Sequence, residues 1–510
     1  MAPAAAALVL SACAVGPDFT RPATTVAPSW RSSGDPRLSA EAATDSQWWK
    51  AFNDSTLDRL VELAYQQNLS LQVAGLRIVE ARARLGVATG QQFPQVQAAV
   101  GSATAEGLSK NTPIGSLVDR HYGNYQIGFD AAWELDFWGK YRRAVQSESA
   151  ALLGSVADYQ NALVSLNAEV ARTYVVIRTY EVLIRQAEGN AKVQEEALGI
   201  AQSRFRNGAT SELDTTQAQT LLESTRASIP QLQIALQQAR NALSTLLGRP
   251  PGSVDAMLGG PSDIPQVPVR VAVGVPAQML RRRPDIRAAE FEAAAQCARI
   301  GVAKAELYPS FTLFGTVGLQ TTSGTPISHS NFFSEDSLFY SVGPRVNWSF
   351  LNYGRITNNV RVQDARFQQL LVGYRETVLR AAREVEDAVV GFLNAQKALV
   401  FEAGAVKAAQ RSVEISAVQY REGAVDYQRV LDAQRSLLQE QNSLTQINSS
   451  VATNLIALYK ALGGGWEVRQ GQPVIPAETE NEMKQRTSWG DMLSQPRRAE
   501  TAASPPPGKQ

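Results

Sequence analysis

The sequence repeats itself once, at a constant offset of 215 residues. The stretch LGVATGQQFPQ at residues 85–95 matches IGVAKAELYPS at 300–310, and RFRNGA at 204–209 matches QYREGA at 419–424. Chance similarity between helical segments would not keep one register through loops and strands, so we interpret the chain as two copies of one unit. We therefore predict repeat 1 at residues 57–248, a linker at 249–275 and repeat 2 at 276–463.

Each repeat is expected to contain a helix, two strands, a long helix and a further helix. Between Gly139 and Asn207 there is no proline, and apolar residues recur at alternating spacings of three and four. This heptad pattern is typical of helices packed lengthwise, and about 68 residues would give a rod of roughly 100 Å. The shorter helices expected at 57–92 and 211–247 together approach that length. Stacked end to end they would form a second rod, so two repeats predict four parallel rods.

The segment YQIGFDAAWELDF, residues 125–137, alternates between apolar and other side chains. A period of two predicts a strand with one apolar face and one wet face. Asp130, Glu134 and Asp136 fall on the wet face, and we expect them to line an aqueous lumen. The corresponding segment of repeat 2 keeps the apolar face but carries Arg345 among uncharged polar residues. The lumen beside this strand is therefore expected to be acidic on only one side of each subunit.

Two strands per repeat give four per chain, which are too few to close a membrane barrel. An open sheet with an apolar face would leave unpaired edges that neither lipid nor water tolerates, so several chains are expected to share one barrel. The sequence has no uninterrupted run of about 18 apolar residues, and we predict no membrane-spanning helix. The predicted fold class is an α+β membrane protein, with long coiled-coil-like helices as parallel rods and four strands contributed to a shared transmembrane β-barrel.

The N-terminal stretch MAPAAAALVLSAC ends in a short apolar run and a cysteine. Residues 10–13 fit a lipobox, in which a signal peptide is cleaved before a cysteine that is then acylated. We therefore expect a signal peptide at residues 1–12 and a lipidated segment at 13–56, in an exported lipoprotein anchored through Cys13. The leader has no lysine or arginine, which departs from the usual signal peptide. The alternatives are a start codon further upstream and an unmodified cysteine in a leader cleaved elsewhere.

Composition and motifs argue against an enzyme and against a nucleic-acid partner. The formal net charge is +1, and no nucleotide-binding, metal-hydrolase or thiol-redox motif occurs. No cofactor or metal is expected, and His121 and His329 are both expected in polar loops between strands. Cys297 lies in an alanine-rich helical pattern that favours a small buried thiol. Residues 464–510, the tail after repeat 2, are expected to be largely disordered.

Together these features resemble the TolC/OprM-type outer-membrane efflux lipoproteins, the NodT family of outer-membrane factors that serve resistance-nodulation-division pumps. The resemblance rests on AVGPDFTRP after Cys13, the helix ends FPQ and YPS, the helix openings FWGKYRR and NYGRITN, and the stretch YREGAVDYQRVLDAQRSLL. It implies a homotrimer whose twelve-stranded β-barrel crosses the outer membrane above a periplasmic α-barrel about 100 Å long. It also implies a periplasmic adaptor and an inner-membrane pump as partners, contact with outer-membrane lipid, and export of drugs and other small toxic compounds.

The resemblance further implies roles for individual residues at the periplasmic tip. Gly208 and Gly423 match the turns that end the helical hairpins, and Tyr420 and Asp432 match positions that constrict a closed entrance. A ring of like carboxylates would favour cations. Arg429 stands at a position that the family pattern leaves open to aspartate, so the detailed gate network stays undetermined. The alternative for Asp432 is an ordinary solvated helix residue.

The leading interpretation is a passive trimeric conduit that takes its energy from a partner pump. A second interpretation, also a channel, is the exit duct of a type I protein-secretion system, and the lipobox argues against it. A third, from another class, is a periplasmic coiled-coil lipoprotein scaffold with no channel. The alternating strands disfavour that third interpretation.

Overall fold

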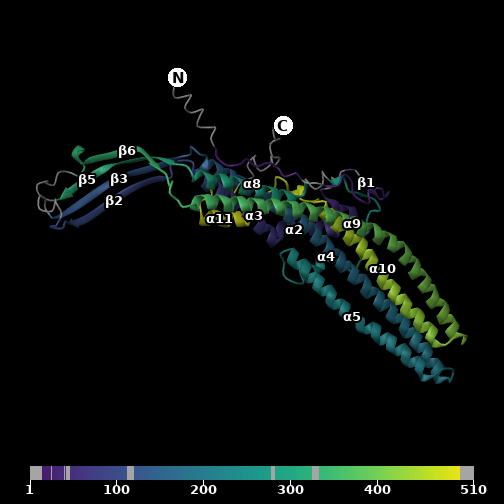
Figure 1. The fold of residues 1–510 in the computed structure, drawn as a ribbon. Helices are drawn as coiled ribbons and strands as arrows, with labels where there is room; N and C mark the ends of the chain where they lie inside the picture. The colour runs from purple at the N-terminus through teal and green to yellow at the C-terminus, as the bar shows by residue number, and fades with distance from the viewer. Residues whose placement is uncertain are drawn as a thin grey trace.

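The computed structural model describes residues 14–23, 26–39, 41, 46–111, 120–276, 282–323 and 332–493. The molecule is elongated, with a small sheet at one end and two helical hairpins at the other (Figure 1). The N-terminal segment runs alongside the helices, beginning close to the place where the sheet meets them. The chain therefore separates strands and hairpin turns to opposite ends of one long body.

Two very long helices run through this body. α4 spans Lys140–Arg206 and α9 spans Arg355–Arg421, and each contains 67 residues, about 100 Å at 1.5 Å per residue. The long helix predicted between Gly139 and Asn207 is confirmed. Among the described helices, only α9 is long and apolar enough to cross a membrane by length and composition, and a single helix of this kind is weak evidence for a span. The shorter helices are α2 (Ser55–Gln67), α3 (Leu69–Gly90), α5 (Glu212–Leu246), α8 (Pro284–Ala305) and α10 (Tyr427–Ala461).

The helices form four rods lying side by side. α3 and α5 both pack against α4, and α8 and α10 both pack against α9. α4 also packs against α8 and α10, which joins the two halves of the chain. The rods therefore follow one another in the order α3 with α5, α4, α8 with α10, and α9, as the pairing of short helices along each long one predicted.

The predicted helix at 57–92 is in fact two helices, because Asn68 interrupts it. Its side-chain Oδ1 accepts the backbone N–H of Leu71 at 2.8 Å and so caps the start of α3. Its Nδ2 donates to the carbonyl of Leu246 at 2.9 Å, at the end of α5. One amide side chain thus ends α2, begins α3 and fixes both to the last turn of α5.

Four antiparallel strands form the sheet, in the order β2-β3-β5-β6. Within the described residues β2 and β6 each have one unpaired edge, and Pro344, which has no N–H to donate, lies in the edge strand β6. His121 is the first residue of β3 rather than part of a loop, because the strand pairing continues to Gly107; His329 lies outside the described residues. The strands are β2 (Val96–Gly107), β3 (His121–Leu135), β5 (Ser310–Ser323) and β6 (Leu338–Asn347).

The register gathers the apolar residues on one face of the sheet. Phe129 pairs with Val317, and Gly315 pairs with Val342. Directly paired residues of antiparallel strands point to the same side, so the alternating residues of three strands make one continuous apolar surface. That surface is open in the single chain, where Phe129 is 68% exposed and Val342 is 79% exposed.

The predicted linker is packed into the helical body. It contributes a short helix, α6 (Asp255–Leu258), and a short strand, β4 (Val271–Ala272), which pairs in parallel with β1 (Leu38–Ser39) of the N-terminal segment. The carbonyl of Leu258 accepts Nη2 of Arg178 at 2.7 Å, and Arg178 also bonds Glu181 at 2.7 Å. This segment therefore closes over α4.

The predicted disorder of the tail is wrong for residues 464–493. After repeat 2 the chain forms α11 (Ala477–Arg486), and Ile475, Met483 and Leu493 are buried in a cluster with Val79 of α3. Three well-spaced apolar side chains are enough to hold a polar segment against the helix. Residues 494–510 lie outside the described residues.

Candidate functional site at the helical tip and the strand-helix junction

The two hairpins end in the same glycine turn. Gly208, between α4 and α5, has φ 73°, and Gly423, between α9 and α10, has φ 77°. The N–H of Gly208 donates to the carbonyl of Phe205 and that of Ala209 donates to Arg204, and the same two bonds recur around Gly423. Positive φ costs glycine little, so each helix reverses without the strain that a side chain would add. Both predicted turn residues therefore lie at the end of the molecule opposite the sheet.

Tyr420 lies inside the tip rather than on its surface. It is 3% exposed, and its Oη donates a hydrogen bond to Oδ2 of Asp214 at 3.1 Å. Its ring meets that of Tyr427 edge-on, with centroids 5.2 Å apart. Burial, and after it the hydrogen bond to Asp214, raise the pKa of Tyr420 to about 12. The phenol is therefore a protonated donor at neutral pH, and it connects the second hairpin to the first.

Arg204 adds a second link between the hairpins. Its guanidinium lies over the ring of Tyr420, 4.7 Å from the centroid, and its Nη1 donates to the backbone carbonyl of Tyr420. The same nitrogen lies 3.4 Å from the carbonyl of Arg421. Arg204, Tyr420 and Asp214 thus form a clamp between hairpins of one chain.

Sequence reasoning found Tyr420 but missed its two partners. Asp214 lies one offset before Arg429, so the two repeats carry opposite charges at matching positions. That mismatch was the available signal for an asymmetric tip. Arg429 itself is exposed, and its side chain forms no ion pair with any of the described residues.

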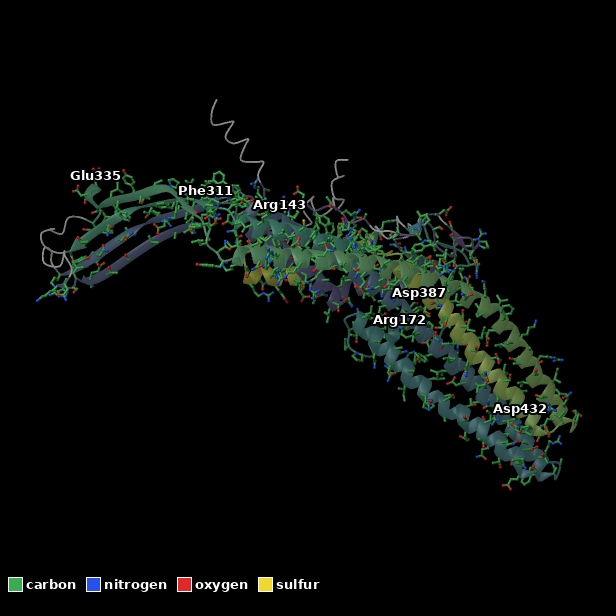
Figure 2. All side chains as sticks on the ribbon, in the orientation of Figure 1. Arg143, Arg172, Phe311, Glu335, Asp387 and Asp432 are labelled. Atoms are coloured by element: carbon green, nitrogen blue, oxygen red, sulfur yellow. The ribbon has the colours of Figure 1, made fainter. Side chains whose placement is uncertain are left out.

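Asp432 is exposed on α10, near the helical end of the molecule (Figure 2). Its Oδ1 accepts Nε2 of Gln428 at 2.9 Å, and Oε1 of Gln428 lies 3.3 Å from Nε2 of Gln217. Gln217 is the matching position of repeat 1. The carboxylate therefore contacts a neutral amide, so its charge is not compensated by that neighbour.

Asp130 and Arg345 lie on the face of the sheet opposite the apolar one. Asp130 pairs with Thr316 of β5, and Arg345 pairs with Thr312 of the same strand. The guanidinium of Arg345 also lies over the ring of Phe314, 4.7 Å from its centroid. This face is therefore polar but carries few charges along the middle of the strands.

Glu134 and Asp136 belong to the junction between β3 and α4. β3 ends at Leu135, and the carboxylate of Asp136 accepts the backbone N–H groups of Tyr141 at 3.0 Å and Arg142 at 2.9 Å. Glu134 accepts the hydroxyl of Tyr141 at 3.0 Å. Asp136 thus caps the first turn of α4, where a negative charge also complements the helix dipole. Of the three acids on the alternating segment, Asp130 and Glu134 lie within β3, where Glu134 pairs with Thr312, and Asp136 lies beyond its end.

The N-terminal segment is fastened to this junction. The N–H of Val15 donates to the carbonyl of Trp138 at 3.0 Å. Nη1 of Arg143 donates to Asp18 at 2.8 Å, and Figure 2 shows Arg143 where the sheet meets the helices. Ala14 lies so close to Gly139 that a Cβ on that glycine would come within 2.7 Å of the Cβ of Ala14. Cys13 lies outside the described residues, but its neighbour is held at the base of the sheet.

Cys297 is a buried thiol of α8, as the helical pattern predicted. It is 1% exposed, and its Sγ lies 3.6 Å from the carbonyl of Pro17. Burial raises the pKa of the thiol. Its role is to pack the N-terminal segment against α8. In the part of the chain that the structure describes, no group of three or more His, Cys, Asp or Glu side chains could hold a metal ion.

Comparisons with known proteins agree with this architecture. A family model described as outer membrane efflux protein matches residues 60–249 and 275–464. The pyoverdine export outer membrane protein OpmQ of Pseudomonas putida is 31% identical over 431 residues, which cover 84% of this chain and 90% of that protein. The probable outer membrane lipoprotein SilC of Salmonella typhimurium is 29% identical over 462 residues, covering 90% of this chain and 97% of that protein.

Among solved structures, the outer-membrane channel OprN is similar with a TM-score of 0.83 and 33% identity, over 89% of this chain and all of that one. The two family matches are separated by the same 215 residues as the sequence repeats, and together they take in the four strands and both hairpins. The chain therefore belongs to the outer membrane efflux protein family, a family of outer-membrane channels of tripartite efflux systems.

Proposed function

We propose that three copies of this chain form one passive conduit across the outer membrane and the periplasm. The observation that carries the proposal is the open sheet. It has one apolar face, and within the described residues each of its outer strands, β2 and β6, has one edge without a partner strand. Pairing β6 of one copy with β2 of the next would satisfy both edges, and three copies would close a twelve-stranded barrel. The four rods of each chain follow the order of the strands, so the same ring would close the α-barrel. The duplicated unit proposed from the sequence supports this, because each repeat supplies one half of every subunit.

We further propose that Cys13 carries the lipid anchor. Ala14 packs at the junction of sheet and helices, so an acyl chain on the preceding residue would start beside the apolar face of the sheet. Two independent features would then set the depth of the protein in the bilayer.

The tip is proposed to be the regulated entrance. The clamp of Arg204, Tyr420 and Asp214 would hold the two hairpins of each chain together in the closed state, and Asp432 from each subunit would add a ring of carboxylates. A periplasmic adaptor and an inner-membrane pump would dock there and supply the energy. The cargo would be drugs and other small toxic compounds, and the chain itself would catalyse no reaction.

Deletion of the gene, followed by two assays, tests the proposal. Cells should become more susceptible to small toxic compounds and should recover when the chain is restored. Unchanged susceptibility with a lost secreted protein would favour a type I secretion duct instead. Purified protein should also conduct ions in planar bilayers, and complete absence of conductance would favour a scaffold with no channel.

A further inference from the structure

Residues that match at the offset of 215 also make matching contacts in the two repeats. In repeat 1 the indole N–H of Trp133 donates to the carbonyl of Gln92 at 3.2 Å. In repeat 2 the matching indole, Trp348, donates to the matching carbonyl, that of Leu307, at 3.1 Å. A contact seen once can therefore be used to predict its counterpart one offset away.

One such contact joins the two repeats at the strand-helix junction. Trp138, which follows β3, stacks on Tyr308, which precedes β5, with ring centroids 4.6 Å apart and planes 23° apart. The indole N–H of Trp138 also donates to the carbonyl of Pro309 at 2.8 Å. This stack fastens the start of α4 to the end of α8.

The counterpart of this stack is missing within the described part of the chain. The residues that match Trp138 and Tyr308 are Tyr353 and Phe93, and they are 98% and 62% exposed. Tyr353 is also held at φ 50°, a backbone conformation that is unfavourable for a bulky residue. Two large rings therefore lie open at opposite edges of the subunit, each at the height where its counterpart is stacked.

The two long helices differ in the same way, because residues buried on α4 have exposed counterparts on α9. α4 packs against α3 and α5 and also against α8 and α10, whereas the described helices that pack extensively against α9 are α8 and α10. The N-terminal segment adds contacts to α9 at Glu386 and Leu393. The buried residues Ala157, Val164 and Val175 of α4 have exposed counterparts on α9. Those counterparts are Val372 (54% exposed), Leu379 (65%) and Val390 (46%).

A polar contact between the repeats also has matching residues one offset away that do not meet within the chain. Nη1 of Arg287 on α8 donates to Oε1 of Gln160 on α4 at 3.0 Å, across the boundary between repeats. The matching residues are Gln72 on α3 and Arg375 on α9, the same two side-chain types with their places exchanged. The open face of α9 thus fits an α3 helix, and the α3 of its own chain is already packed on α4.

We infer that Tyr353 of one subunit stacks on Phe93 of the next, as Trp138 stacks on Tyr308 within the chain. The occupant of the open face of α9 is then a second copy of this chain, presenting α3 and the segment that follows it. This inference rests on the proposed ring and assigns its subunit contact to a particular pair of rings. It also gives the left-handed conformation of Tyr353 a reason, since the ring is held outward toward the neighbouring subunit.

Cysteine cross-linking tests the pair, in a Cys297→Ala background so that the buried thiol does not interfere. The double variant Phe93→Cys with Tyr353→Cys should link chains to one another on mild oxidation, giving dimers and trimers in a denaturing gel. Each single variant should remain one chain in size. The matched control is Trp138→Cys with Tyr308→Cys, whose bridge should form inside one chain and leave its mass unchanged.

A second measurement uses the native rings. Tyr353→Ala should lower the temperature at which the oligomer dissociates in detergent, and Tyr353→Phe, which keeps the ring, should leave it nearly unchanged. The inference is overturned if the wild-type chain is a trimer by native mass while the 93/353 pair gives no linked chains and Tyr353→Ala behaves as wild type. A wild-type chain that is a monomer by native mass would overturn the proposed ring as well.

Discussion

Removing one hydroxyl at the tip should open the conduit. Tyr420→Phe deletes the hydrogen bond from Oη to Asp214, 3.1 Å long, and leaves the ring contacts with Tyr427 and Arg204 in place. A buried hydrogen bond to a charged group contributes about 1.5–3 kcal/mol. If the bond exists only in the closed tip, its loss should raise the ratio of open to closed states roughly 10- to 100-fold per chain.

Single-channel recording in planar bilayers measures this shift directly as a larger open fraction or a larger mean conductance. The matched control is Tyr427→Phe, because Tyr427 is equally buried but its hydroxyl forms no hydrogen bond with the described residues. That variant should conduct as wild type does. A Tyr420→Phe channel indistinguishable from both would refute the clamp, and a double variant with Asp214→Asn should add little to Tyr420→Phe alone.

The clamp also has a defined pH range. The pKa of Tyr420 is raised to about 12 by burial and by its bond to Asp214, above the ordinary value near 10. A raised pKa in the folded state means that the stabilising protonated form is fully present below about pH 10 and is lost between about 10 and 12. Conductance should therefore show no Tyr420-dependent change between about pH 6 and 9, and wild type should approach Tyr420→Phe only above about pH 10. A difference between the two that vanishes already near pH 7 would contradict this assignment.

Three further substitutions test other parts of the account. Cys13→Ala should abolish labelling by palmitate, whereas a variant that is still labelled would exclude Cys13 as the anchor. Asp432→Asn should reduce the preference for cations, read as a smaller shift in reversal potential under a salt gradient; an unchanged potential would make Asp432 an ordinary surface residue. Gly423→Ala should lower stability by about 1–2 kcal/mol because of its φ of 77°, whereas Gly404→Ala, with open space around it on α9, should stabilise; thermal unfolding distinguishes them. Equal midpoints for the two alanine variants would contradict the turn geometry.

The regular parts of this fold follow from periodic patterns in the sequence. The spacing of three and four that begins after Gly139 predicts one very long helix, which is observed with 67 residues, and the alternation around Phe129 predicts a strand with one apolar face. Both patterns extend over many residues, so local exceptions do not obscure them. The number of rods, four per chain, follows from the helix lengths, whereas their order does not.

The predictions from sequence were wrong at positions where a single side chain decides where a helix, a strand or an ordered segment ends. Asn68 breaks a helix through two hydrogen bonds, and Asp136 leaves the alternating strand because it caps α4. The hydrogen bonds of Asn68 and Asp136 leave no trace in the spacing of apolar residues along the sequence. Met483 anchors a segment whose average composition is that of a disordered tail. The role of such a residue can be predicted only when the residue that it contacts in the folded structure is known.

The contacts of the candidate site at the tip could not be predicted from the sequence either. Tyr420 was identified through a family resemblance, which supplies a position but not its contacts. Asp214 and Arg204 come from the other hairpin, more than 200 residues away in sequence, and repeat 2 carries different residues at their matching positions. No pattern within either hairpin could have joined the three.

The central claim is that the open four-stranded sheet closes only in a ring of three chains. Native mass spectrometry of the full acylated chain, extracted from the outer membrane in mild detergent, measures the number of copies directly. We expect a complex of three chains, with no folded monomer at equilibrium. A stable, folded monomer that keeps its strands in detergent would contradict it.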